Sequence, residues 1–469
     1  MSENSHSNQS SVFSILREAV RGSSRDLTSA PIGTALFILS VPMIFEMFAE
    51  SLFAIVDIFF VAHLGAEAIA VVGLTESMMA LVYAVAFGIA IGATATVARR
   101  VGEKDPEGAA VTATHVIYLG IILSIVISIL GIALAPTLLA ALGAEASVAE
   151  LGIPFTRIML GGNAVVMFLF ILNAIFRGAG DAAIAMRVLW VANGLNMILS
   201  PCLIFGVAFF PRLGVTGAAV GTTIGRGCGV LFALWYLFRG EKKFEIRSRH
   251  WRLEPDRLWK LIKLSSTAVL QFLISTASWS ALVRVVAGFG SEAIAGYVIA
   301  LRVVIFVLLP SLGLSNAAAT MVGQNLGAGR PDRSEAAVWK AAFTNTAIYL
   351  VLGIALLIGA ATIVSFFTTE PTVNAYATRA LTIVAYGFAF YGFGMVTETA
   401  FNGAGDTWTP TWLNFLIFWV LEIPLAYVLA YHFGLGPDGV FWAITIAFSV
   451  LAVVGGLMFK RGKWKLKQV

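Results

Sequence analysis

The chain has very few charged residues for its length. Only 12% of its 469 residues are Asp, Glu, Lys or Arg, whereas soluble domains carry about 25%. Cysteine and histidine are also scarce, with two and five residues. The lack of charge excludes an ordinary soluble domain, and two cysteines cannot supply a disulfide framework. Cys202 and Cys228 both fall in apolar runs, where packing accounts for them, and no spacing of Cys or His is typical of a metal site.

Apolar residues make up most of the rest, at 59% with a mean hydropathy of +0.88. They form twelve runs of about 20–30 residues, each long enough to cross roughly 30 Å of hydrocarbon as a helix. The predicted fold class is therefore an all-α integral membrane protein with twelve transmembrane helices. The expected spans are 35–62, 66–98, 110–142, 152–177, 183–208, 214–239, 260–288, 292–323, 335–368, 377–401, 408–433 and 438–460.

Short motifs recur at a fixed distance of 225 residues. HLGAEAIA at 63–70 matches GFGSEAIA at 288–295, and FRGAGD at 176–181 matches FNGAGD at 401–406. Such self-similarity predicts an internal duplication into two bundles of six helices. An even number of spans in each half makes the repeat parallel. The expected divisions are an N-terminal lead (1–34), an N-terminal bundle (35–239), a linker (240–259), a C-terminal bundle (260–460) and a basic tail (461–469).

The basic residues are distributed unevenly between the two ends of the spans. By count, 25 of the 31 Lys and Arg lie at the termini or in the even-numbered loops. The other side holds only Arg157, Arg212, Arg284 and Arg379. The positive-inside rule then predicts that both termini are cytoplasmic, in a plasma membrane of the bacterial inner-membrane type. Nucleic-acid binding would require basic residues clustered on a soluble face, so no such partner is expected.

The first span carries three acidic residues, Glu46, Glu50 and Asp57. On a helix Glu50 lies about 40° and Asp57 about 20° from Glu46, so the three form one stripe. An ionised side chain at the centre of a membrane helix costs about 2.5–3.5 kcal/mol. The stripe is therefore predicted to face the protein interior and to bind protons or cations. The alternative for Glu46 and Glu50 is a structural hydrogen-bond network. Other charges inside spans are Glu76, Arg226, Arg302, Glu398 and Glu422.

The paired GAGD motifs stand between spans four and five and between spans ten and eleven. Their glycines predict tight turns, because glycine adopts backbone conformations that other residues avoid. Asp181 and Asp406 are expected to cap the helices that follow.

Several motifs together resemble one transporter family. VDIFFVAHLG at 56–65, the FRGAGD and FNGAGD turns, and LNMILSPCLIFG followed by LGVTGAAVGT are similar to the multidrug and toxic compound extrusion (MATE) family, over essentially 35–460. The resemblance implies a monomeric secondary antiporter in membrane lipid that exports small cationic amphiphilic compounds by alternating access. It also implies exchange for H⁺ or Na⁺, with no other cofactor.

The resemblance assigns the first coupling residues. The family's first-helix aspartate falls on Asp57, its fifth-helix asparagine on Asn196 and a sixth-helix threonine on Thr222. Ser200 stands where an aspartate is often found, so the site has one carboxylate fewer, which favours H⁺ over Na⁺. Any Na⁺ is expected near Asp57. Glu46 and Glu50 join this coupling group through the stripe.

The second half departs from the family's sodium-coupled branch. Gln271 replaces a seventh-helix glutamate, and a tenth-helix aspartate falls near Tyr391. The residues predicted for the substrate cleft are Gln271, Trp279, Tyr391, Glu398 and Glu422. At the 225-residue offset none of these acids, nor those of the stripe, is repeated. This asymmetry predicts that the two bundles have specialised.

Two other classes of protein are compatible with parts of this pattern. A lipid-linked oligosaccharide flippase of the same superfamily is favoured if the cleft is cationic. A membrane enzyme needs a His/Glu metal set or a Ser/His pair, and no such set appears, so no enzymatic activity is expected.

Overall fold

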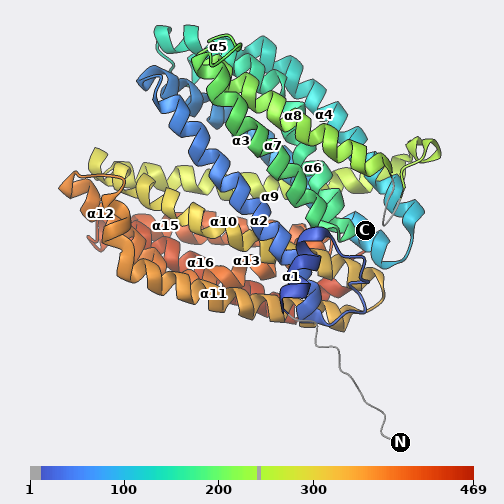
Figure 1. Ribbon diagram of the computed structural model, residues 1–469. Helices are drawn as coiled ribbons and strands as arrows, with labels where there is room; N and C mark the ends of the chain where they lie inside the picture. Colours follow the sequence, from blue (N-terminus) through green and yellow to red (C-terminus); the bar gives the residue numbers. More distant parts are fainter. Residues whose placement is uncertain (1–11, 240–244, 469) are drawn as a thin grey trace, which may run out of the picture.

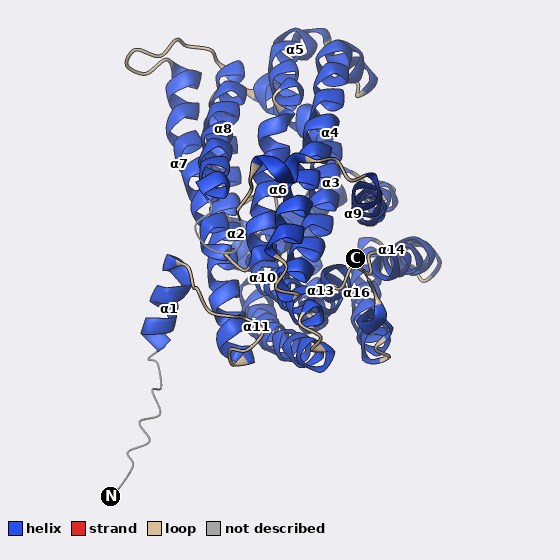
Figure 2. Cartoon of the chain, turned by 90° about the vertical axis from the view of Figure 1, so that its right-hand side faces the viewer, coloured by secondary structure: helices blue, strands red, loops and turns tan. Residues whose placement is uncertain are grey.

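The computed structural model describes residues 12–239 and 245–468, and this part of the chain is helical throughout, with no strand (Figures 1 and 2). The first half contains α1 (Val12–Arg21), α2 (Ile32–Ala62), α3 (Ala66–Gly102), α4 (Pro106–Ala141), α5 (Ala146–Gly161), α6 (Asn163–Ala179), α7 (Ala182–Phe205) and α8 (Val215–Arg239). The second half contains α9 (Pro255–Ala287), α10 (Ser291–Gly327), α11 (Pro331–Ser365), α12 (Pro371–Ala385), α13 (Phe388–Gly403), α14 (Trp408–Asn414), α15 (Ile423–Tyr427) and α16 (Pro437–Lys460). Two π-helical segments, Phe415–Glu422 and Val428–His432, join α14, α15 and the loop before α16.

The expected twelve-span membrane fold is confirmed. Eleven helical spans within the described residues are long and apolar enough to cross a membrane, and the bent pair α12–α13 supplies the twelfth. The sequence did not predict that span ten is broken, with its halves 60° apart. Span four is also built from two helices, α5 and α6, which meet at Gly162. Its counterpart at the 225-residue offset, Gly387, stands before α13, so the interruption is part of the duplicated unit.

The duplication is visible in the helix ends. The helix α3 begins at Ala66 and α10 at Ser291, and both are preceded by a glycine with a φ near +100°. The next helices, α4 and α11, both begin with a proline in the first turn, where the missing N–H costs no hydrogen bond. The two six-helix halves lie as separate bundles in Figure 1.

The glycines of the two GAGD motifs serve two purposes. Gly180 and Gly405 have φ values of +84° and +82°, so they form the expected turns. Gly178 and Gly403 instead allow close helix packing, because an added Cβ would lie 3.0 Å from the carbonyl oxygen of Thr94 and 2.4 Å from that of Ala319. Only the second glycine of each motif is therefore a turn residue.

The predicted capping by the GAGD aspartates is wrong. Asp181 makes no side-chain capping hydrogen bond to α7, and its carboxylate accepts one from the Tyr236 hydroxyl at 3.3 Å. Asp406 precedes the N-cap residue of α14, and its carboxylate forms an ion pair with Lys467 at 3.1 Å. Asp181 is thus held by a side chain from α8. Asp406 bridges Lys467 of the tail and the Thr409 hydroxyl in the first turn of α14, which donates to the carboxylate at 2.7 Å.

The helix α2 is shared between the two bundles. Its first half buries Leu36, Leu39 and Met43 in a cluster with Leu314 of α10 and Val338 of α11. Its second half packs against α7 and ends in the core of the N-terminal bundle. The helix continues without a break through Pro42. The acidic stripe therefore starts where α2 passes from one bundle to the other.

The two bundles meet closely at the end of the molecule where α1 and the C-terminal end of α16 lie, hereafter the terminal end (Figure 1). An added Cβ on Gly102 would lie 2.0 Å from the carbonyl oxygen of Gln324, and one on Gly327 would lie 2.1 Å from that of Arg99. The Gln324 amide also donates to the Gly178 carbonyl at 2.9 Å. Only glycine allows the backbones of α3 and α10 to approach this closely.

The C-terminal tail lies across this contact and joins the two bundles. Trp464 is fully buried, and its ring stacks on Phe459 with centroids 4.5 Å apart. The carbonyl of Lys467 accepts a hydrogen bond from Arg99 at 2.8 Å. Lys465 pairs with Glu335 at 2.6 Å, and this hydrogen bond raises the pKa of Lys465. The tail therefore binds α3 of one bundle and α11 of the other.

The linker between the halves is ordered where it is described; residues 240–244 lie outside the described part. The buried His250 contacts the Glu107 carboxylate at 2.7 Å, and its carbonyl accepts from Thr114 at 2.9 Å. The Tyr118 hydroxyl donates to the carbonyl of Trp251 at 2.7 Å. This stretch is anchored to α4.

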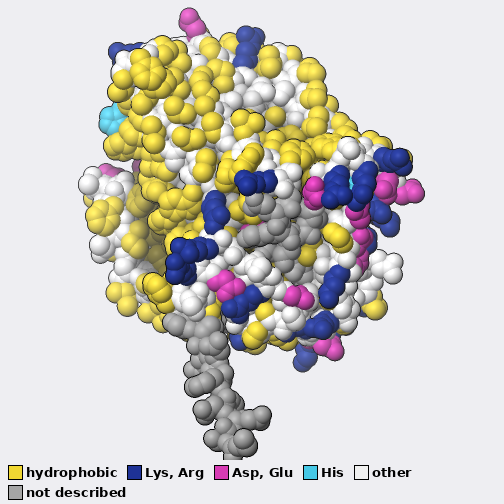
Figure 3. Space-filling model, turned by 45° about the vertical axis from the view of Figure 1, so that its right-hand side comes forward, with side chains coloured by type: hydrophobic (Ala, Val, Ile, Leu, Met, Phe, Trp, Pro, Cys, Tyr) yellow, Lys and Arg dark blue, Asp and Glu magenta, His cyan; other side chains and the backbone are white. Residues whose placement is uncertain are grey.

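Lys and Arg side chains gather near the terminal end, while apolar side chains cover much of the visible N-terminal bundle (Figure 3).

Gly102→Ala is expected to open the terminal end. The added methyl group overlaps a backbone oxygen that cannot rotate away, and overpacking of this kind costs about 1–3 kcal/mol. A shift of that size changes the balance between closed and open states by roughly 5- to 150-fold. The distance between spin labels at positions 104 and 332 should lengthen. In the control, Gly73→Ala on the same helix, the new Cβ has no neighbour within 4 Å, so the distance distribution should match the wild type.

Candidate functional site

Two of the three stripe acids are neutralised by arginine. The Glu46 carboxylate is 1% exposed and lies 2.8 Å from the Arg177 guanidinium of α6. It also accepts a hydrogen bond from the Asn173 amide at 3.3 Å. Arg177 belongs to the FRGAGD motif, which therefore supplies the counter-ion for the first helix. Glu46 thus lies in a hydrogen-bond network with α6 and is a compensated charge, and its part in coupling stays a prediction.

Glu50 has a similar arrangement one turn further along α2. Its carboxylate lies 2.8 Å from the guanidinium of Arg226 on α8 and accepts from the Asn193 amide of α7 at 3.0 Å. Arg226 is 1% exposed and also lies over the Phe53 ring, 4.9 Å from its centroid. Its Nε and Nη1 atoms have no hydrogen-bond partner among the described residues. This arginine is therefore able to donate to another acceptor.

Asp57 is the stripe residue without a partner. No hydrogen bond to its carboxylate is found in the described chain, and its Oδ1 atom is buried. The charges that act on it are Glu76, which repels the carboxylate, and Arg226, which attracts it. Glu76 interacts in turn with Arg226 and Glu50. Arg302 of α10 forms no described ion pair with Glu76. Three acids therefore surround Arg226, and the four residues are hereafter called the Arg226 cluster: Glu50, Asp57, Glu76 and Arg226.

The three polar residues carried over from the family form a second group. The Asn196 amide donates to the Thr222 hydroxyl at 2.8 Å, and the Ser200 hydroxyl lies 3.4 Å from the amide oxygen of Asn196. All three are buried. The structure therefore brings these residues of α7 and α8 together, but no described hydrogen bond joins them to Asp57.

The C-terminal bundle contains a matching acid without an arginine. The Glu398 carboxylate accepts from the Gln271 amide at 2.7 Å and from the Asn414 amide at 2.8 Å. The same Asn414 amide lies 3.0 Å from the Ser275 hydroxyl. Neutral donors satisfy this carboxylate, so its charge is solvated but not cancelled.

The two acid–amide pairs are related by the duplication with their roles exchanged. Glu46 corresponds to Gln271 and Asn173 to Glu398 at the 225-residue offset. In the first bundle α2 supplies the acid and α6 the amide; in the second, α9 supplies the amide and α13 the acid. Each acid therefore belongs to one copy alone, as expected, but the acid–amide pair to which it belongs occurs in both copies. The pairing is common to both bundles, and only the added Arg177 is not.

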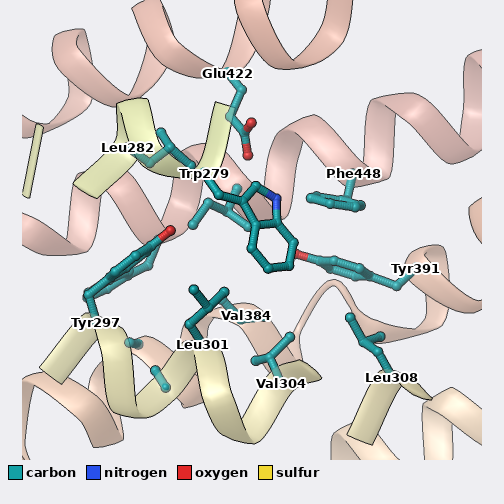
Figure 4. Close-up of a pocket in the computed structure, with 14 residues that line it drawn as sticks. Trp279, Leu282, Tyr297, Leu301, Val304, Leu308, Val384, Tyr391, Glu422 and Phe448 are labelled. Atoms are coloured by element: carbon teal, nitrogen blue, oxygen red, sulfur yellow. The ribbon is translucent and has the colours of Figure 1, made fainter. Parts of the chain in front are cut away.

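Three of the predicted cleft residues line a pocket inside the C-terminal bundle. Trp279, Tyr391 and Glu422 face one another there, with Tyr297 and Phe448 completing the aromatic wall (Figure 4). The empty volume is about 490 Å³, including space at its mouth. Its lining residues come from α9, α10, α12, α13, α16 and the first π-helical segment. The pocket therefore belongs to one bundle and is not shared between two, as a central cleft would be.

Sequence reasoning missed several of these side chains. Nothing in the sequence marks Arg177, Asn193 or Asn414 as part of a site. In the fold each of them donates a hydrogen bond to an acid. The π-helical segment that ends at Glu422 also has no sequence signature, although such segments are frequent at functional sites. The described residues contain no group of three His, Cys, Asp or Glu side chains that could hold a metal ion.

Comparison with known proteins agrees with this architecture. The family model MatE matches residues 42–202 and 267–428, one match in each half. The chain is 26% identical over 443 residues to the probable multidrug resistance protein NorM of Thermotoga maritima, covering 92% of this chain and 93% of that protein. It is also 26% identical to the FAD transporter of Shewanella oneidensis, covering 91% and 94%.

Solved structures match equally well. A structure described as the outward-facing conformation of a multidrug resistance MATE family transporter is similar with a TM-score of 0.88 and 27% identity. The match covers 96% of this chain and 99% of that one. Both halves of the sequence, the twelve-span fold and the duplicated motifs thus agree: the chain belongs to the MatE family of multi-pass membrane transporters.

Proposed function

We propose that the protein is a secondary antiporter that exports small cationic amphiphilic compounds in exchange for H⁺ by alternating access. The observation that carries this proposal is the Arg226 cluster, where three acids share one arginine within the N-terminal bundle. The similarity to proteins named for multidrug resistance and multidrug export supports the class of cargo. The protein works as a monomer in the bacterial inner membrane, with no cofactor beyond the coupling ion.

Coupling follows from the unequal numbers of acids and bases in the cluster. Arg226 neutralises Glu50 and leaves Asp57 and Glu76 with net negative charge. Asp57 is partly buried and Glu76 is exposed, but both lie within the span of a membrane helix. A carboxylate without a partner at that depth favours binding of a proton or a cation, because an isolated ion there is costly. When Asp57 loses its proton, the two unpartnered nitrogens of Arg226 are available to it. Protonation and release thus alter which carboxylate the arginine holds, which changes how α2 and α8 contact each other.

A proton suits this site better than Na⁺. Hard metal ions surround themselves with several oxygen ligands. Here Ser200 supplies a hydroxyl where a second carboxylate would strengthen a Na⁺ site, and Arg226 already brings a positive charge next to Asp57. If Na⁺ is the coupling ion after all, the oxygens nearest to Asp57 remain its expected ligands.

Cargo of positive charge is favoured over anionic cargo. Both arginines that face the stripe are paired with acids, Arg177 with Glu46 and Arg226 with Glu50. Glu398 and Glu422 have no described basic partner. The Shewanella relative is named for FAD, which is a polyanion. A carrier of such a polyanion needs free positive charge in its cleft, and so does a flippase for lipid-linked oligosaccharides. Export of FAD or of a lipid-linked sugar by this protein would contradict the assignment.

The direct test is dye efflux from proteoliposomes under separately imposed H⁺ and Na⁺ gradients. A proton gradient alone should drive export of a cationic dye, and a Na⁺ gradient alone should not. One charge moving across 100 mV contributes about 2.3 kcal/mol, or roughly a 50-fold concentration ratio. Export driven only by Na⁺ would overturn the choice of proton, and export driven by neither gradient would overturn antiport.

The orientation is tested by cysteine labelling. Cysteines at positions 243 and 465 should react with a membrane-impermeant reagent only from the cytoplasmic side, and one at 438 only from outside. Lys243 lies outside the described residues, whereas Lys465 lies in the tail at the terminal end. The excess of Lys and Arg at that end is the physical reason. Labelling of position 243 from outside intact cells would reverse the topology.

A further inference from the structure

Glu422 is a fully buried acid that the coupling scheme does not use. Its side chain is 0% exposed, and neither carboxylate oxygen has a hydrogen-bond partner among the described residues. It stands at the last position of the first π-helical segment, directly before α15. No Lys, Arg or His is among the described residues that line its pocket. A carboxylate in this position requires a positive charge or a proton from outside the fold.

The rest of the pocket is built from aromatic rings. Figure 4 shows the Glu422 carboxylate directed at the indole of Trp279, with the hydroxyl groups of Tyr297 and Tyr391 pointing into the same space. Tyr391 stacks on Phe448 with ring centroids 4.3 Å apart, and Tyr297 stacks on Phe441 at 6.3 Å. The Tyr391 hydroxyl is also buried without a hydrogen-bond partner in the described chain. The rings are thus held in place by neighbours and do not rely on a ligand for their position.

This combination selects for a particular kind of cation. Aromatic faces attract a cation through their quadrupoles, most strongly when water is excluded, and cages of such rings bind quaternary ammonium groups. A hard metal ion needs several oxygen ligands, whereas this lining offers one carboxylate and two phenol oxygens among hydrocarbon side chains. A polar anion is excluded by the carboxylate itself.

We propose that this pocket is a binding subsite for the ammonium group of a compact organic cation, with Glu422 as its counter-ion and Trp279, Tyr297 and Tyr391 as its aromatic walls. The subsite lies within the C-terminal bundle, away from the Arg226 cluster in the N-terminal bundle. The inference rests on the proposed function only in treating the cation as cargo; binding itself requires no gradient. Cargo and coupling ion then occupy different bundles, so they are linked through the motion of the fold and not by competition for one carboxylate.

The experiment is equilibrium binding by calorimetry on the purified full-length protein, with choline and 3,3-dimethylbutan-1-ol as probes. The two molecules share a shape, and only choline is charged. Choline should bind at least tenfold more tightly than the alcohol, and Glu422→Gln should lower choline binding at least tenfold. Trp279→Leu should lower it by roughly 2- to 30-fold, the range for loss of one cation–π contact. Glu370→Gln, the same change at an exposed acid before α12, should leave binding unchanged.

The contrary results are distinct. Equal binding of the two probes, or unchanged choline binding in both Glu422→Gln and Trp279→Leu, would overturn the subsite. Heat released by NaCl but not by choline, and lost in Glu422→Gln, would also overturn it and indicate an inorganic cation. If Glu422→Gln fails to fold, Trp279→Leu and the probe comparison still decide. Because no gradient is present, failure here leaves the antiport proposal standing, and failure of dye efflux leaves the binding result standing.

Discussion

Asp57→Asn is expected to abolish gradient-driven efflux while the protein remains folded. Asparagine has nearly the shape of a protonated aspartate but cannot release a proton, so it fixes the residue in one state of the cycle. Asp57 makes no described hydrogen bond that the amide would break. It is also the stripe acid without its own arginine, since Glu46 and Glu50 are paired at 2.8 Å. Removal of its charge therefore takes away the proton-binding step and leaves the ion pairs intact.

The measurement is dye efflux from inverted vesicles, normalised to the amount of folded transporter. The variant should lose the whole concentrating effect of the gradient, roughly 50-fold per 100 mV for one charge, while substrate binding persists. Glu398→Gln should cause a smaller loss, because neutral amides already solvate that carboxylate. Glu67→Gln, at an exposed acid in the first turn of α3, should have no effect. Full efflux in Asp57→Asn together with loss in Glu398→Gln would move the coupling site to the C-terminal bundle.

Arg226→Met is expected to be the most destabilising single change in the Arg226 cluster. It leaves the Glu50 carboxylate without its counter-ion and removes the charge that acts on Asp57 and Glu76. Breaking one side of a buried ion pair costs about 3–5 kcal/mol. The lower end applies here, because the Glu50 side chain is 22% exposed. Thermal unfolding in detergent should show a clear fall in the transition temperature.

A second substitution separates charge from packing. Glu50→Gln in the Arg226→Met background should recover most of the lost stability, because glutamine still accepts a hydrogen bond from Asn193 and carries no charge. Arg249→Met provides the control, since its pair with Glu107 is more than half exposed on both sides and such pairs contribute about 0–1 kcal/mol. If the double variant is no more stable than Arg226→Met, the loss arises from packing around the guanidinium, including its contact with Phe53.

Hydropathy and repetition made the overall architecture predictable. Spans such as 66–98 and 292–323 coincide with α3 and α10, because a long apolar run has few alternatives to a membrane helix. The breaks at Gly162 and Gly387 were not predictable, since the apolar composition continues through them. The sequence also does not show that α2 packs against both bundles, because the apolar side chains of α2 find apolar neighbours in either bundle.

The candidate site was predictable in its acids but not in their partners. An ionised carboxylate inside a membrane helix is energetically unfavourable, so a lone acid in an apolar run indicates a functional residue. Asp57 and Glu422 are predicted on this basis. Arg177 and Asn193 are on helices distant in sequence, and only folding shows that they meet Glu46 and Glu50. The comparison of repeats position by position showed correctly that Glu46 and Glu398 are not repeated, but it could not show that the acid–amide pair is kept while its two members exchange.

That exchange bears on how two fused copies of one ancestral bundle can diverge. Two facing amides can form a hydrogen bond without any charge. A symmetrical ancestor with an amide at both positions of the pair would therefore keep its hydrogen bond before either amide was replaced by an acid. One copy now carries its acid at Glu46 beside Arg177, and the other carries its acid at Glu398 without an arginine. Each copy thereby acquires its negative charge on a different helix. The charge asymmetry between the copies thus involves only three positions: the two exchanged acids and Arg177, which compensates the buried acid of the first copy.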